Sequence, residues 1–240
     1  MKQDELWLIW RVADPKSENR RRYRIGTLKW IEEKDLYEFE YDYNHDFKEA
    51  LSAGFSYFPG FENTTKGHIY TSEGSLFPTI SSRLPKPERD DYLDLLNRYG
   101  LDVKDSPFKV LSTTKGRQIT DNFEFVPAFN TEKIEFDIAG VSHLQKSELL
   151  KHFEDGHLRN GAKLRLSLDK ENEYDKFAIK ILLPIKEKNI FLGYVPRYYS
   201  KDLTEIIEKG TEYSAIITAI NLHSKIRDEG ISARIRLIFA

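Results

Sequence analysis

The chain has 240 residues, a formal net charge of −2, 40% hydrophobic residues and no cysteine. This composition is typical of a globular protein, and the near-zero charge argues against a protein that coats nucleic acid non-specifically. Without cysteine there are no disulfides, thiol nucleophiles or cysteine zinc sites, and a reducing compartment is favoured. No apolar run approaches the ~20 residues that span a bilayer. The opening MKQDELWLIWRV is a poor signal peptide, so we expect a cytoplasmic protein without a membrane partner.

The first half of the chain begins with strands and continues with helices. Apolar or alternating segments predict strands at 5–12, 23–31 and 36–43. Helices are expected at 45–54, 86–101 and 106–116. Pro87 and Pro107 suit the first turn of a helix, and Ser106 suits an N-cap.

A proline and polar residues interrupt the pattern in VPAFNTEK, residues 126–133. This short segment predicts a boundary between two units, residues 1–128 and 129–240. In the second unit, Ser147 is expected to cap a helix at 146–156, with Leu149, Leu150 and Phe153 facing inward. A second helix is predicted at 199–210. Strands are predicted at 162–168, 176–184, 189–196, 211–220 and 233–240.

Many short strands with two short helices in about 110 residues predict a small closed or half-open β-barrel. The first unit mixes strands with helices. The predicted fold class is therefore α+β, with an α+β unit followed by the barrel.

Signatures of enzymes are missing from the sequence. There is no P-loop, no GxGxxG after a strand, no HExxH and no set of kinase motifs. The closest histidines, His152 and His157, are spaced i, i+5, which places them on different faces of a helix and argues against a metal site. We expect a protein that is not an enzyme and has no cofactor and no metal.

The segment NEYDK, residues 172–176, allows two interpretations. Asn172 and Asp175 favour a turn, because their side chains accept hydrogen bonds from nearby backbone N–H groups. Alternatively, Tyr174 is a stacking platform for the bases of a single strand. A basic groove would then come from Lys163, Arg165, Lys176, Lys180 and Arg197. The Asp175 carboxylate would repel phosphates, so it fits such a groove only where the nucleic acid presents a hydroxyl.

From about residue 136 to residue 222 the sequence resembles the HIRAN domain family. The family's most recognisable element is a strand, then Asn-Pro-Tyr-Asp, then Asn-Ala and another strand. Asn172, Tyr174, Asp175 and Ala178 match it. The chain departs from the pattern at residue 173, where glutamate replaces the usual proline, and at residue 177, where phenylalanine replaces the usual asparagine.

This resemblance implies a small β-barrel with two helices, similar in outline to an OB-fold, that binds the 3′ end of single-stranded DNA. It assigns to Tyr174 stacking on the terminal base and to Asp175 contact with the terminal 3′-hydroxyl. A second stacking aromatic of the family corresponds to His143 here, whose imidazole stacks less well than a larger ring. Asn172 is included in the predicted nucleic-acid site.

A second resemblance covers about 80 residues of the first unit. LFPTISSRLPKPERDDYLDLLNRYGL followed by SPFKVLSTTKG is similar to the N-terminal lobe of HipA-type kinases, without the kinase lobe that normally follows. The matching positions are Leu84, Pro85, Arg89, Gly100, Pro107 and Phe108. We also expect Leu84 and Phe108 to pack in a core.

Two functions follow from these resemblances. The leading one is non-enzymatic binding of single-stranded DNA by the HIRAN-like unit. The alternative is a protein-interaction regulator, in which the first unit docks a HipA-type kinase as in a three-part toxin–antitoxin system.

Overall fold

The computed structural model describes residues 3–12, 21–222 and 231–238, and the chain divides into two compact units, residues 1–128 and 129–240. Each unit is considered by itself. None of the helices in the described ranges has the length and apolar character needed to cross a membrane.

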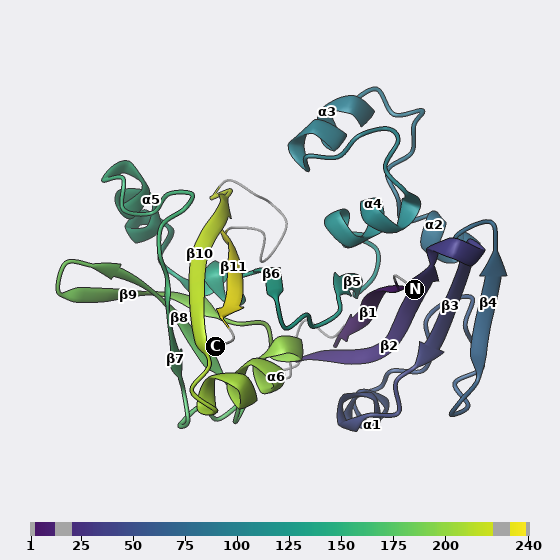
Figure 1. Ribbon diagram of the computed structural model, residues 1–240, viewed down its shortest axis with the longest axis horizontal. Helices are drawn as coiled ribbons and strands as arrows, with labels where there is room; N and C mark the ends of the chain where they lie inside the picture. Colours follow the sequence, from purple (N-terminus) through teal and green to yellow (C-terminus); the bar gives the residue numbers. More distant parts are fainter. Residues whose placement is uncertain (1–2, 13–20, 223–230, 239–240) are drawn as a thin grey trace. The chain divides into compact units, whose positions relative to one another are not determined.

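The first unit is built on a five-stranded antiparallel sheet with the strand order β4-β3-β2-β1-β5 (Figure 1). The three predicted strands are confirmed, whereas β4 and β5 were not predicted. The strands are β1 (Gln3–Arg11), β2 (Arg22–Ile31), β3 (Leu36–Tyr41), β4 (Ile69–Glu73) and β5 (Phe123–Pro127).

The helices of this unit are α1 (His45–Ser52), α2 (Pro78–Ser81), α3 (Tyr92–Arg98) and α4 (Pro107–Thr114), with a 3-10 turn η1 (Glu32–Lys34). The predicted cap of α4 is confirmed, because the N–H of Lys109 donates to Ser106 Oγ at 3.2 Å. The predicted start of α3 near Pro87 is wrong. Residues 86–92 form i to i+3 turns, and an Arg89–Asp91 side-chain pair at 2.8 Å closes them.

Aromatic rings fill the core of the first unit. Phe39 lies 4.5 Å from Phe61 between ring centroids, and the buried hydroxyl of Tyr41 donates to the carbonyl of Phe61 at 2.7 Å. Leu84 packs against this core and Phe108 is buried within it, as expected. The predicted likeness to a kinase lobe stays a prediction.

The second unit contains two three-stranded antiparallel sheets, with the orders β10-β11-β6 and β7-β8-β9 (Figure 1). The predicted strands are present, and β6, which follows the boundary segment, was not predicted. Their bounds are β6 (Lys133–Asp137), β7 (Arg165–Leu168), β8 (Ile179–Ile185), β9 (Lys188–Tyr194), β10 (Glu212–Ile220) and β11 (Ile231–Ile238). The last two residues of the strand predicted at 233–240 lie outside the described part.

Of the two predicted forms, closed or half-open barrel, the closed form is not present among the described residues, because their strands do not make one continuous ladder. Instead, the two sheets meet at two seams. At one, Ala139 and Tyr194 exchange backbone hydrogen bonds of 2.9 Å, and at the other Lys163 bridges Ile216. Gly193 at φ +131° makes the first seam possible, because a Cβ there would lie 2.3 Å from the carbonyl oxygen of Ala139.

The other elements in the described part of the second unit are the 3-10 turn η2 (Val141–His143) and the helices α5 (Lys146–Glu154) and α6 (Arg197–Glu208). Two expectations for α5 are wrong. The helix is preceded by Gln145, whose side chain makes no capping hydrogen bond, and Ser147 lies inside the first turn. Leu149 is buried, whereas the side chain of Phe153 is 50% exposed.

Candidate nucleic-acid interface

The turn between β7 and β8 is organised by the side chain of Asn172. Its Oδ1 accepts hydrogen bonds from the backbone N–H groups of Tyr174 and Asp175, both at 3.0 Å. Asparagine suits this role because its short amide mimics a turn of the backbone. The turn interpretation of the NEYDK segment is therefore confirmed. The hydrogen bonds of Asn172 hold the backbone of Tyr174, whose ring is the candidate stacking platform.

Tyr174 projects from this turn with 71% of its surface exposed. Large apolar side chains are usually covered, because burying one contributes roughly 1.5–3 kcal/mol. An exposed ring on a tethered backbone offers a face for stacking.

Asp175 lies partly buried beneath the turn, and both of its carboxylate oxygens accept hydrogen bonds from the protein. Oδ1 accepts from the N–H of Phe177 at 2.9 Å, and Oδ2 accepts from the hydroxyl of Ser200 in α6 at 2.7 Å. A carboxylate has about four lone-pair sites, so each oxygen retains acceptor capacity. Asp175 thus ties the turn to α6 and can still accept a hydrogen bond from a ligand.

Asp169, at the end of β7, connects the turn to the neighbouring strands. Its Oδ1 pairs with Lys180 Nζ at 2.9 Å, and its Oδ2 accepts from the hydroxyl of Tyr194 at 3.1 Å and from Nδ2 of Asn172 at 3.2 Å. The hydrogen bond from Lys180 lowers the pKa of Asp169 and in turn raises the pKa of Lys180. Burial, and then the bond to Asp169, raise the pKa of Tyr194. The partly exposed ammonium group of Lys180 is therefore paired with a carboxylate of the protein itself.

Polar and aromatic groups share the outer face of the β7-β8-β9 sheet. Ser167 lies opposite Lys180, and Lys180 lies opposite Tyr194. Residues opposite one another in antiparallel strands point to the same face. Arg165 is two positions from Ser167 and is exposed on this face.

The remaining predicted residues come from several elements of the second unit. Lys176 is exposed directly after Asp175, with its Nζ 4.9 Å from the ring centroid of Phe177. Lys163 is exposed at the seam that precedes β7. Arg197 begins α6, and its carbonyl oxygen lies 2.8 Å from Oγ of Ser200. His143 is exposed at the end of η2, in the loop that follows the seam at Ala139. The predicted nucleic-acid contacts of all these residues stay predictions.

Three residues that build this site were missed by the sequence analysis: Asp169, Tyr194 and Ser200. Asp169 carried a usable signal, because aspartate favours turns and this one directly follows the strand predicted at 162–168. Tyr194 and Ser200 carried none, since their roles depend on the packing of β9 and α6 against the turn.

The sequence-based separation of His152 and His157 is also wrong. The i, i+5 argument assumed a continuous helix, but α5 ends at Glu154 and Gly156 adopts φ +71°. The chain reverses there, and the N–H of His157 donates to the carbonyl of His152 at 3.0 Å. The two rings consequently lie 6.3 Å apart between centroids.

Comparison with known proteins gives a family match within the second unit. Residues 131–232 match the family model described as the HIRAN domain. A protein from Lactobacillus plantarum, solved as a structural genomics target, is 19% identical, with 44% of this chain and 91% of that chain covered at a TM-score of 0.34. The HIRAN domain of human HLTF is 15% identical, with 45% of this chain and 75% of that chain covered at a TM-score of 0.33. No curated protein matches the chain.

Proposed function

From the HIRAN domain at residues 131–232 we infer that the second unit binds single-stranded DNA, without enzymatic activity, and that it favours strands with a free 3′ end. HIRAN domains are a family of DNA-binding domains, and this match is the observation that carries the proposal. The proposed surface is the turn at residues 172–176 together with the outer face of the β7-β8-β9 sheet.

The exposed ring of Tyr174 supports a single-stranded ligand. Bases of a single strand are free to stack on an aromatic side chain, whereas bases in a duplex are already stacked on one another. Lys176 next to the turn, and Lys163 and Arg165 at the other end of β7, are exposed and can contact the phosphates of a strand. Because the positive charge of Lys180 is already paired with Asp169, we expect the strand to make few phosphate contacts.

The position of Asp175 supports a preference for a 3′-hydroxyl. An ionised carboxylate accepts hydrogen bonds and repels phosphate, and Asp175 lies next to the exposed ring of Tyr174. A base that stacks on the ring would bring its sugar close to this carboxylate. A terminal hydroxyl donates to it, whereas a terminal 3′-phosphate meets a like charge.

Fluorescence anisotropy tests the proposal. The full chain is titrated into labelled single-stranded DNA, duplex DNA and RNA of matched length, at two salt concentrations. We expect the single strand to bind most tightly. Equal binding to duplex and single strand, or no binding at the lower salt concentration, would contradict the function.

A protein-interaction role for the first unit is the second candidate, favoured by its exposed apolar side chains. Leu93 is 62% exposed, Val103 is 59% exposed and Ile119 is fully exposed. Leu93 and Val103 lie in or near α3, which has a separate small core of Leu96, Leu101 and Val110. A HipA-type kinase is the partner that the sequence resemblance predicts. Co-purification of such a kinase with the full chain, and its loss in Leu93→Asp, would support this role, while equal retention by both proteins would oppose it.

A further inference from the structure

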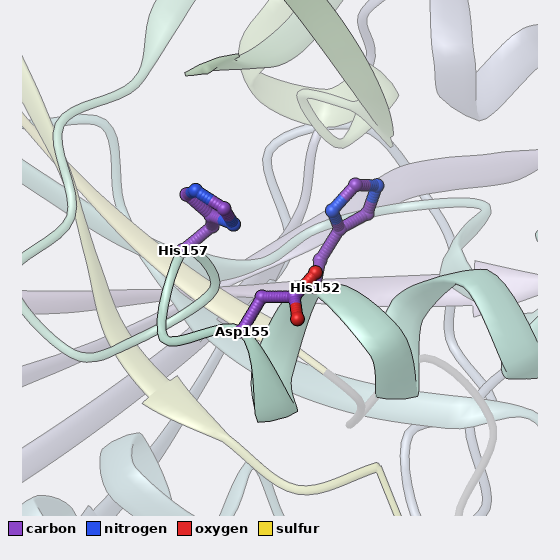
Figure 2. Close-up of side chains that lie close together, drawn as sticks. All are labelled: His152, Asp155 and His157. Atoms are coloured by element: carbon purple, nitrogen blue, oxygen red, sulfur yellow. The ribbon is translucent and has the colours of Figure 1, made fainter. Parts of the chain in front are cut away.

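A polar cluster lies at the end of α5 and plays no part in the proposed DNA site. His152, Asp155 and His157 each offer one ligand atom, and these atoms all lie within 4.8 Å of one another. Figure 2 shows the two imidazoles and the carboxylate directed toward a common space. We propose that this cluster binds a divalent transition-metal ion, with Zn²⁺ as the ion that suits it best.

The backbone holds the three residues together before any ion binds. His152 lies in the last turn of α5, Asp155 is its C-cap, and His157 follows the reversal at Gly156. The carbonyl of His152 accepts hydrogen bonds from the N–H of His157 at 3.0 Å and from the N–H of Leu158 at 2.8 Å. Leu158 is completely buried, so the reversed chain is anchored in the unit.

The imidazole nitrogens provide independent support for a ligand. Nδ1 of His152 and Nδ1 of His157 are both shielded from solvent and have no hydrogen-bond partner. Buried polar atoms in proteins are nearly always satisfied, and a pair of unsatisfied nitrogens in one cluster requires a reason. A metal ion between the rings would satisfy both, because a neutral imidazole nitrogen is a common metal ligand.

The donor set favours one class of ion. Two imidazoles and a carboxylate suit Zn²⁺ and its neighbours among the transition metals, whereas Mg²⁺ and Ca²⁺ prefer oxygen ligands throughout. At Zn–N distances of about 2.0–2.1 Å, tetrahedral ligands lie roughly 3.4 Å apart, so small side-chain rotations would close the cluster. Three protein ligands leave a fourth position for water, and the exposed carboxylate of Asp155 gives the ion access from solvent.

The test is a zinc titration of the full chain, prepared without a histidine tag, against a chromogenic chelator. We expect one Zn²⁺ per chain, and affinity at least tenfold lower in His152→Gln, in His157→Gln and in Asp155→Asn. His68→Gln is the matched control, because it removes an imidazole from the first unit, where His68 packs against Tyr70. Its zinc affinity should equal that of the wild type, and Mg²⁺ should not compete.

Thermal melting separates loss of the site from loss of the fold. Zinc should raise the Tm of the wild type and leave the Tm of His157→Gln unchanged, while the two proteins melt alike without zinc. If His157→Gln has a lower Tm than the wild type without zinc, the comparison is repeated with Asp155→Asn. The side chain of Asp155 is exposed, so this change should not disturb the fold. Zinc affinity that is unchanged in all three variants, or absent in the wild type, would overturn the proposal.

Discussion

The hydroxyl of Ser200 in α6 donates a hydrogen bond of 2.7 Å to Oδ2 of Asp175 in the turn between β7 and β8. Ser200 is buried, so this contact is shielded from competing water. Asp175 therefore has a structural partner inside the protein as well as its proposed ligand. An alanine at position 175 would disturb both, and variants are needed that separate them.

Asp175→Asn removes the negative charge of this side chain and keeps nearly the same size and shape. The amide oxygen can still accept from Phe177, and its nitrogen can donate to the Ser200 hydroxyl, so we expect a melting temperature close to that of the wild type. The preference for a 3′-hydroxyl over a 3′-phosphate should shrink by about 1.5–3 kcal/mol, the usual worth of a hydrogen bond to a charged group. Fluorescence anisotropy with matched oligonucleotides measures this preference. A circular strand, which has no 3′ end, is included as the reference.

Ser200→Ala is the matched control for that experiment. It should lower the free energy of unfolding by about 1 kcal/mol, because one buried hydrogen bond is lost, and should leave the end preference in place. If the wild type binds hydroxyl, phosphate and circular forms equally, Asp175 has only its structural role.

Tyr174→Ala tests the stacking platform. Loss of one stacked base should weaken single-strand binding by about 1–3 kcal/mol, whereas Tyr174→Phe should bind nearly as well as the wild type. Because the ring is exposed, neither change should alter thermal stability. Tyr57→Ala is the control, since Tyr57 is a 48% exposed tyrosine of the first unit. Equal losses in Tyr57→Ala and Tyr174→Ala would remove Tyr174 from the interface.

The salt dependence of binding should be shallow, and the exposed basic residues should account for it. Each phosphate contact with a single strand contributes about 0.7 to the slope of log affinity against log salt concentration. Arg165→Ala and Lys176→Ala are each expected to reduce the slope by about that amount. The control is Lys109→Ala, which removes an exposed cation of the first unit. A slope unchanged in both test variants would place the strand elsewhere.

Acid should destabilise the first unit through Glu124, which is buried between Arg22 and Arg117. Burial alone would raise its pKa, but the two guanidinium groups outweigh burial and lower the pKa from 4.5 to about 2. A lowered folded pKa means that stability is present above pH 4.5 and is lost as the pH falls toward 2. Glu124→Gln should be less stable than the wild type at pH 7 by on the order of 3 kcal/mol, and this difference should shrink through that window.

Tryptophan fluorescence during urea unfolding measures the free energy of unfolding of the first unit alone. Trp7, Trp10 and Trp30 are the only tryptophans of the chain, and all lie in the first unit. Glu135→Gln is the control, because it removes the same charge from the second unit. A constant difference between wild type and Glu124→Gln from pH 7 to pH 2 would contradict the assigned pKa.

The sequence could predict the features of the fold that depend on residues close together along the chain. Alternating apolar residues revealed most strands, Ser106 with Pro107 revealed the start of α4, and Asn172 revealed a turn. It could not predict what depends on three-dimensional packing. The two seams and the bond from Ser200 to Asp175 each join segments that are far apart along the chain, so no local pattern connects them. The meeting of His152 with His157 follows from the end of α5 and the reversal at Gly156, which the spacing argument left out.

The hydrogen bonds that Asn172 accepts from Tyr174 and Asp175 have a consequence for the speed and strength of ligand binding. The turn acquires its conformation when the unit folds, so a ligand that stacks on Tyr174 need not order the backbone beneath the ring. Preorganised surfaces lose less entropy on association. The turn would thus already have its binding conformation when a strand of DNA arrives. The conformational entropy lost on binding would come mainly from the DNA strand.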